Sequence, residues 1–327
     1  MSPAATAAGL FSFVREVFAM RVAAIDIGTN TVLLLVAERD IHGKLVAVEE
    51  HATITRLGQG VDKTRTLAPD AVERTNTCLD RYAEIVARLG VTRTDVVGTS
   101  AMRDAGGGDA VRDHVQTRFG VAARTISGDE EAKLTFAGAL SGLDLPDGRV
   151  VVFDIGGGST EVVDGDRSTR AISFARSYDV GSVRLTERHV TSDPPNEMDR
   201  GAVSRAASDA FAPVPDSVRG APVVGIAGTV TTLAAISLGM ESYDGSRVHG
   251  LTLPLAELER VVEMLARVPL EQRRSIAGLE PKRADVIVAG GLVVLAFLRH
   301  VGAESVTVSD RGVRWGLAEL LLADASL

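Results

Sequence analysis

Two segments that lie far apart in the chain share one pattern: an apolar strand, an Asp-x-Gly turn and a second apolar strand. The first reads RVAAIDIGTNTVLLLVAE from Arg21 to Glu38, and the second reads RVVVFDIGGGSTEVVDGD from Arg149 to Asp166. β-Branched and aliphatic runs that stop at a glycine-rich turn predict strand, tight turn, strand. One such turn is common in plain hairpins. Two copies with matched flanks predict two similar domains that face each other.

The two turns carry residues suited to binding phosphate. Glycines permit positive φ and the close approach of another backbone or a ligand, and successive N–H groups in such a turn form a concave anion-binding nest. Asp154 and Glu161 place two carboxylates at the mouth of the second nest, which suits a divalent cation better than a bare anion. Asp26 is the counterpart of Asp154 in the first turn. The pattern predicts a magnesium-assisted phosphate site.

Two helix starts add candidates for the same site. Ser127 is a natural N-cap before Glu130 and Glu131. Acidic residues are favoured there by the helix dipole alone, but a helix that bridges two domains would also bring a carboxylate into the cleft between them. Gly228 and Thr229 follow an apolar strand and would present N–H groups to a phosphate, although an ordinary strand-to-helix turn reads the same way.

Composition limits the class of protein. At 327 residues, with 45% hydrophobic and 24% charged residues, the chain is long enough for two globular domains. The formal net charge of −8 argues against a nucleic-acid binder, so a polyanionic substrate needs a local basic track. Arg103, Arg184 and Arg247 are the candidates for that track.

The cysteine and histidine content indicates neither a disulfide nor a zinc site. Cys78 is the one cysteine, which excludes an internal disulfide, fits a reducing compartment and predicts a buried residue on a helix. The six histidines form no HxxxH pair and have no CxxC partner, so zinc is not expected. We retain His249 as a candidate substrate contact.

Residues 1–20 precede the first predicted strand as an N-terminal extension or an upstream start-site assignment. Their apolar stretch is short, is interrupted by Arg15 and Glu16, and lacks a basic start, so neither a signal peptide nor a membrane anchor is expected. No other stretch has the uninterrupted apolar length that crosses a bilayer. We therefore expect a cytoplasmic protein without a membrane partner.

Taken together, an ordered set of motifs resembles the exopolyphosphatase / guanosine pentaphosphate phosphohydrolase (Ppx/GppA) family, of the actin–sugar kinase–Hsp70 (ASKHA) superfamily. The motifs follow the order of the family and span Arg21 to Leu320. The chain is similar to the short, two-domain members. The matching motifs are DIGTNT, GTSAMRDA, SGDEEAKLTF, DIGGGSTE, VGSVRLTE, SDPP, GIAGTVTTLAA, RVHGL, RADVIVAGG and VSDRGVRWGLA.

The resemblance implies an α/β fold of two ribonuclease H-like (actin-like ATPase) domains with an interdomain cleft. We expect domain I over residues 21–141 and domain II over residues 145–310. A C-terminal helix in residues 311–327 would then return to pack on domain I. Hinge closure over substrate is expected in this superfamily.

The resemblance also assigns roles to residues. It implies Glu131 as the general base, Asp154 and Glu161 as catalytic and metal-binding acids, and Asp26 as a further cleft acid. The metal would be Mg²⁺, with Mn²⁺ as the alternative. The residues expected to contact substrate are Asp26, Gly28, Thr29, Asn30, Thr31, Arg103, Gly156, Gly157, Gly158, Ser159, Gly228 and Thr229.

The leading functional hypothesis is an exopolyphosphatase, a hydrolase that releases orthophosphate from the ends of inorganic polyphosphate by metal-assisted attack of water. Guanosine pentaphosphate phosphohydrolase, which would place the chain in the stringent response, is the runner-up. The aromatic content of 4% offers few stacking residues and leans toward polyphosphate. A superfamily kinase fits less well, and a non-catalytic polyphosphate or alarmone sensor is the second alternative. No nucleic-acid partner is expected, and the oligomeric state stays open, with a homodimer as one candidate.

Overall fold

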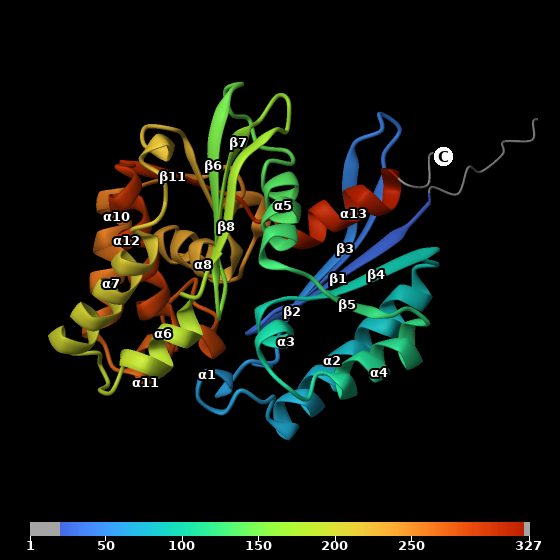
Figure 1. Ribbon diagram of the computed structural model, residues 1–327, viewed down its shortest axis with the longest axis horizontal. Coiled ribbons are helices and arrows are strands. Elements are labelled where there is room, and N and C mark those ends of the chain that lie inside the picture. The colour runs from blue at the N-terminus through green and yellow to red at the C-terminus, as the bar shows by residue number, and fades with distance from the viewer. Residues whose placement is uncertain (1–19, 324–327) are drawn as a thin grey trace, which may run out of the picture.

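The structure is a computed structural model that describes residues 20–323, and it contains two α/β halves, each built on one sheet (Figure 1). The predicted N-terminal extension, apart from Met20, lies outside the described residues. The first sheet has the strand order β3-β2-β1-β4-β5. Its strands are β1 (Val22–Ile27), β2 (Thr31–Arg39), β3 (Leu45–Ile54), β4 (Arg93–Gly98) and β5 (Ala123–Thr125).

The second sheet repeats the plan of the first. In each sheet, three strands form an antiparallel meander, and two later strands extend the sheet in parallel on the other side of its first strand. Strand β10 adds an antiparallel edge, giving the order β10-β11-β9-β6-β7-β8. The strands are β6 (Arg149–Ile155), β7 (Thr160–Asp166), β8 (Ile172–Tyr178), β9 (Val223–Ile226), β10 (Thr252–Pro254) and β11 (Ser305–Val308).

Helices cover both sheets. The first half carries α1 (Val61–Thr64), α2 (Pro69–Arg88), α3 (Ser100–Asp104) and α4 (Asp109–Phe119). The second half carries α6 (Ser182–His189), α7 (Glu197–Phe211), α8 (Ala227–Ser237), α9 (Gly245–Val248), α10 (Leu255–Arg267), α11 (Leu270–Arg273) and α12 (Ile287–Val301), with 3-10 turns η1 (Asp216–Val218) and η2 (Pro281–Arg283).

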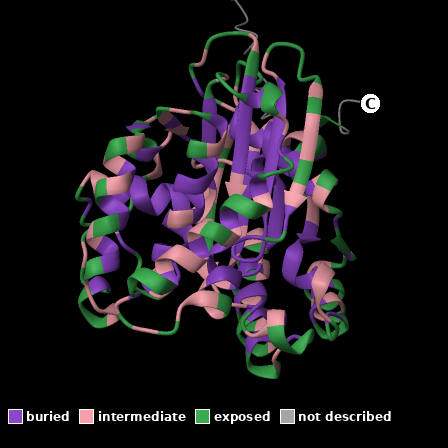
Figure 2. Cartoon of the chain, turned by 60° about the vertical axis from the view of Figure 1, so that its left-hand side comes forward, coloured by how far each residue is buried: buried purple, intermediate pink, exposed green. Residues whose placement is uncertain are grey.

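Each sheet has its own hydrophobic core, and Figure 2 shows the buried residues concentrated along the strands and on the helices beside them. Cys78 is buried on α2, as predicted, and packs with the apolar side chains of β1 and α4. In the second half, Phe297 of α12 packs against Phe153 and Phe211, with ring centroids 4.6 and 5.2 Å away. Burial of this apolar surface is the main favourable term in folding.

Two helices join the halves: α5 (Gly128–Ala139) and α13 (Val313–Ala323) lie between the sheets (Figure 1). The apolar face of α5 packs on the second sheet, and α13 packs on the first. They cross where a Cβ on Gly138 would overlap the carbonyl oxygen of Gly312, and a Cβ on Gly316 would overlap that of Leu134. Only glycine permits backbones to approach this closely.

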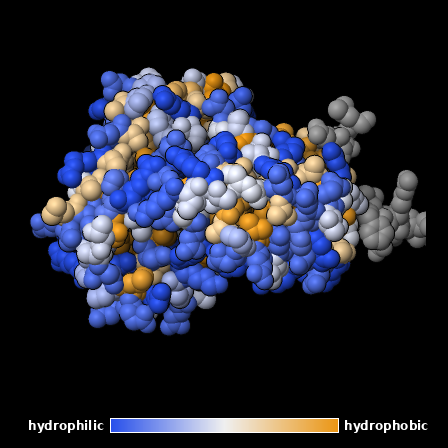
Figure 3. All heavy atoms as spheres, turned by 60° about the horizontal axis from the view of Figure 1, so that its bottom comes forward, coloured by the Kyte–Doolittle hydropathy of each residue, from blue (hydrophilic) through white to orange (hydrophobic). Residues whose placement is uncertain are grey.

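The polarity of the surface is consistent with the 24% of charged residues in the sequence. The face shown in Figure 3 is largely hydrophilic, and its apolar patches are small and separated. None of the helices between residues 20 and 323 combines the length and the apolar character that a bilayer span requires.

Candidate functional site

A cleft of about 1240 Å³ lies between the two halves, and the turns singled out from the sequence line it. It brings together the β1–β2 turn, the β6–β7 turn and the N-terminus of α8. The predicted site residues on its wall are Asp26, Gly28, Thr29, Asn30, Thr31, Glu131, Asp154, Gly156, Gly157, Gly158, Ser159, Glu161, Gly228 and Thr229.

The two hairpin turns have the same local geometry. The amide of Gly28 donates to the carbonyl oxygen of Thr31, and that of Gly156 to the carbonyl oxygen of Ser159, both at 3.0 Å. None of the glycines at residues 28 and 156–158 has positive φ. These glycines are needed because space is limited: a Cβ on Gly157 would lie 3.1 Å from the Thr29 side chain in the β1–β2 turn, and a Cβ on Gly158 would lie 2.6 Å from the Ser100 Oγ of α3. The two turns therefore meet tip to tip at the base of the cleft.

Four carboxylates from four elements converge on this cleft. Asp154 and Glu161 face each other across the β6–β7 pair. Glu161 is 1% exposed, and its Oε1 accepts a hydrogen bond from the Ser177 Oγ at 2.6 Å. Asp26 is the penultimate residue of β1, and its Oδ1 is buried without a hydrogen-bond partner. Glu131 lies in the first turn of α5, where the Ser127 side chain caps the helix, as predicted.

This concentration of buried negative charge perturbs all four groups. Burial raises the pKa of Asp26 to about 7. The charge of Arg314 opposes this rise, and the charge of Glu161 adds to it. Burial and repulsion by Glu161 and Asp26 raise the pKa of both Glu131 and Asp154 well above the usual range. Burial raises the pKa of Glu161 as well, against its hydrogen bond from Ser177. A bound cation would relieve the repulsion.

The cleft residues fit a magnesium ion whose coordination would be completed by substrate and water. Among residues 20–323, no three His, Cys, Asp or Glu side chains form a cage that could hold a metal by themselves. Mg²⁺ is usually bound through one or two carboxylates, with phosphate oxygens and water as the remaining ligands. Asp154 and Glu161, paired across neighbouring strands at the cleft, are the two carboxylates that could bind such an ion.

The arginines expected to form a basic track do not line the cleft. Arg103 lies behind Glu131, because its Nη1 donates to the Glu131 Oε2 at 3.0 Å and to the carbonyl oxygen of Ile126 at 3.2 Å. Arg184 is buried and bonded to Asp62 and Asp104. Arg247 is exposed on α9 and is not among the residues that line the cleft.

Sequence reasoning missed Arg283, which does line the cleft. Its Nη2 lies 3.3 Å from the Thr31 Oγ1, and its guanidinium packs so closely on Gly228 that a Cβ there would overlap it. Within residues 20–323 it makes no ion pair with a carboxylate. The sequence signal was the RADVIVAGG motif, which begins at this arginine. An uncompensated guanidinium between the first turn and the α8 terminus is well placed to contact a phosphate.

Comparison with known proteins assigns the family. The profile of the Ppx/GppA phosphatase family matches residues 35–323. The chain belongs to this family. Exopolyphosphatase 2 of Mycobacterium tuberculosis is 38% identical over 316 residues, which cover 91% of this chain and 97% of that protein. Membership makes the chain a phosphatase-type hydrolase, as predicted.

Solved structures of Ppx/GppA-like proteins share the fold. An exopolyphosphatase-like protein superposes with a TM-score of 0.87 at 32% identity, covering 94% of this chain and all of that one. The Aquifex aeolicus Ppx/GppA family member superposes with a TM-score of 0.78 at 32% identity, covering 93% of this chain and 98% of that one. The predicted fold class, two ribonuclease H-like domains of the actin-like type, is confirmed.

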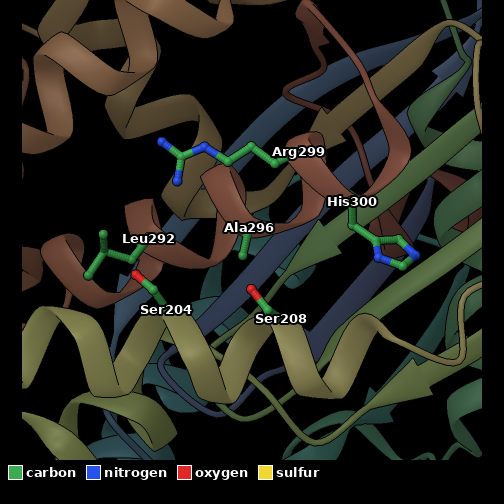
Figure 4. Close-up of a pocket in the computed structure, with 6 residues that line it drawn as sticks. All are labelled: Ser204, Ser208, Leu292, Ala296, Arg299 and His300. Atoms are coloured by element: carbon green, nitrogen blue, oxygen red, sulfur yellow. The ribbon is translucent and has the colours of Figure 1, made fainter.

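A second depression of about 240 Å³ lies between α7 and α12 (Figure 4). Arg299, the arginine among its lining residues, pairs with Glu259 at 2.7 Å. The depression holds no carboxylate, so the interdomain cleft remains the candidate site of this Ppx/GppA protein. The residues that line the depression are Ser204, Ser208, Leu292, Ala296, Arg299 and His300.

Proposed function

We propose that the protein is an exopolyphosphatase that releases orthophosphate from the end of an inorganic polyphosphate chain. The observation that carries the proposal is the convergence of Glu131 with both hairpin turns on one cleft. A row of phosphoryl groups needs backbone donors along its length, and its hydrolysis needs one carboxylate beside the terminal group. The name of the 38% identical relative supports the same substrate.

In the proposed reaction, the oxygen of a water molecule attacks the terminal phosphorus, and the bond to the bridging oxygen breaks. Glu131 accepts a proton from that water, and the bridging oxygen leaves on the shortened chain. Phosphoryl transfer has a loose transition state, so the protein mainly positions groups and neutralises charge. The N–H groups of residues 28–31 and 156–159 would hold successive phosphates, and Arg283 would neutralise one of them.

The proposed reaction also uses a divalent cation. Asp154 and Glu161 would hold Mg²⁺, or Mn²⁺ in its place, and the ion would supply charge neutralisation at the terminal anhydride. Asp26 would stand across the cleft from this pair. We also propose that the protein acts in the cytoplasm.

The electrostatics of Glu131 suit a general base. Its pKa is raised by burial, by Glu161 and by Asp26, and it is lowered by the ion pair with Arg103. A raised pKa strengthens a carboxylate as a base, and the arginine favours the ionised form that must accept the proton. Glu131 would therefore be a stronger base than an ordinary carboxylate, with Arg103 favouring its ionised form.

Guanosine pentaphosphate is the second candidate substrate, which would link the protein to the stringent response. Tyr243 favours it, because this ring lines the cleft and is 52% exposed, so a base could stack on it. Trp315, the other Phe, Tyr or Trp residue that lines the cleft, is buried and covered by the Arg311 guanidinium, which lies 3.8 Å from its ring centroid. With one accessible ring, the cleft favours the inorganic chain.

A phosphate-release assay tests the proposal. Long polyphosphate, tripolyphosphate, guanosine pentaphosphate and ATP are compared with Mg²⁺ present. Loss of a positioned base costs roughly 10²- to 10⁴-fold in rate, so Glu131→Gln should reduce kcat by about that much. Glu130→Gln is the matched control, because Glu130 is on the same helical turn but pairs with Arg124 at 2.9 Å. A wild-type protein that binds polyphosphate without releasing phosphate would instead support the sensor.

A further inference from the structure

A series of ion pairs leads from Glu131 into the opposite half of the molecule. Arg103 Nη1 donates to the Glu131 Oε2 at 3.0 Å, and Arg103 Nε lies 3.7 Å from the Asp104 Oδ1. The Asp104 Oδ2 in turn accepts a hydrogen bond from the Arg184 Nη2 at 2.9 Å. Arg103 and Asp104 belong to α3 of the first half, whereas Arg184 belongs to α6 of the second.

Arg184 forms hydrogen bonds to residues of both halves of the molecule. Its Nε donates to the carbonyl oxygen of Gly158 at 2.6 Å, within its own half, and its Nη1 donates to the Asp62 Oδ1 at 3.0 Å, across the interface. The exposed carboxylate of Asp179 is 3.7 Å from its Nη2. Arg184 is only 7% exposed. All these contacts hold together only while the two halves keep their present arrangement.

Asp104 has two arginines within reach, and it bonds closely to only one of them. Its partners are Arg184 at 2.9 Å, the Ser100 Oγ at 3.2 Å and the more distant Arg103. A partly buried carboxylate that loses its guanidinium is costly. If the halves separate and Arg184 withdraws, the nearest remaining guanidinium is Arg103, which at present orients Glu131.

We propose that Arg184 and Asp104 couple closure of the two halves to the positioning of Glu131. With the halves together, Arg184 holds Asp104 and leaves Arg103 to Glu131. With the halves apart, Asp104 draws Arg103 toward itself, and Glu131 loses the contact that orients it. The inference rests on the proposed function, in which Glu131 is the base. Arg184 and Asp104 do not line the cleft, so they are positioning residues.

This arrangement would make hydrolysis conditional on closure. Domain closure about a hinge is a common way to complete a catalytic site only when substrate is bound. Here the sensing contact is Arg184 at the interface, and the responding group is the Arg103–Glu131 pair. A displacement of about 1 Å at a reacting group can cost roughly 10²-fold in rate, so a modest shift of Arg103 is sufficient.

The test measures kcat and KM for polyphosphate in four proteins: wild type, Arg184→Gln, Arg184→Gln/Asp104→Asn and Arg188→Gln. Arg188 is the matched control, because it also binds Asp62 across the interface, at 2.5 Å, but does not bind Asp104. We expect Arg184→Gln to lower kcat by roughly 10- to 100-fold. Adding Asp104→Asn removes the competitor for Arg103 and should restore about tenfold of that loss in kcat.

We also expect Arg184→Gln to raise KM, because Asp62 and Gly158 lose their partner. The double variant still lacks these contacts, so its KM should stay raised. A double variant with no recovery of kcat would overturn the coupling, since an arginine that merely joins the halves is not replaced by removing Asp104. An equal fall in kcat for Arg188→Gln would overturn it too. An inactive wild type would refute the proposed function as well.

Circular dichroism and thermal unfolding establish that each variant is folded. If Arg184→Gln does not fold, Arg184→Lys replaces it in both the single and the double variant. Lysine keeps one positive charge but cannot reach Gly158, Asp62 and Asp104 together. The same recovery on addition of Asp104→Asn is expected, and its absence in this pair would equally contradict the coupling.

Discussion

Burial of Asp26 should make the contribution of this carboxyl to the stability of the free protein less favourable at neutral pH than at acid pH. The pKa of this carboxyl is about 7 in the folded protein, against 3.8 as its ordinary value. The folded state therefore holds the proton more tightly than the unfolded state does. Its contribution to stability is complete below about pH 4 and is lost progressively as the pH rises to about 7.

The expected change in the free energy of unfolding follows from the size of this pKa shift. One pKa unit corresponds to about 1.4 kcal/mol, so a rise from 3.8 to about 7 costs the ionised folded state about 4 kcal/mol at pH 8. Asp26→Asn carries no charge and removes that cost. We expect the variant to be more stable than wild type by about 4 kcal/mol at pH 8 and by less than about 2 kcal/mol at pH 5.

Urea unfolding of the metal-free, substrate-free protein at the two pH values measures this difference. Asp166→Asn is a control of opposite sign, because the amide and hydroxyl of Thr169 lower the pKa of this exposed carboxyl. Equal stability of Asp26→Asn and wild type at pH 8, or a gain that does not depend on pH, would refute the reasoning. Since Asp26 lines the cleft, we also expect the stabilised variant to lose activity.

Three further predictions address packing, a buried arginine and substrate binding. Gly316→Ala should destabilise the fold by about 1–3 kcal/mol or more, whereas Gly201→Ala, where only the flexible Arg205 is near the added Cβ, should not; urea unfolding compares them. Arg273→Met should cost about 2–5 kcal/mol in the same assay, because the guanidinium donates to three backbone carbonyls, two of them buried contacts. Arg283→Gln should raise KM for polyphosphate about tenfold or more with a smaller change in kcat, as phosphate-release kinetics can show.

Local patterns in the sequence were sufficient for much of the fold. The duplicated hairpins at Asp26 and Asp154 formed as expected, because β-branched runs and glycine turns act over a few residues. The Ser127 cap set the start of α5 for the same reason. Their convergence on one cleft followed from the duplication, since two equivalent hairpins in facing domains present equivalent ends.

Partners that meet only through tertiary packing could not be read from the sequence. Arg103 binds Glu131, and Arg184 binds Asp104. The sequence around these arginines does not distinguish them from arginines that would contact a phosphate. Arg283 was overlooked because its proximity to Thr31 and Gly228 depends on how the two halves dock. A guanidinium is assigned to substrate only after its carboxylate partners are known.

The contact between the two hairpin tips restricts how proteins of this architecture can diversify. A Cβ on Gly157 would lie 3.1 Å from Thr29, and a Cβ on Gly158 would lie 2.6 Å from the Ser100 Oγ, so added side chains would press on the opposite half. An insertion in either turn would wedge the halves apart, so neither turn can vary in length independently of the other. We therefore expect new substrate preferences to arise at exposed positions of the cleft wall, such as Glu241, Ser242 and Tyr243.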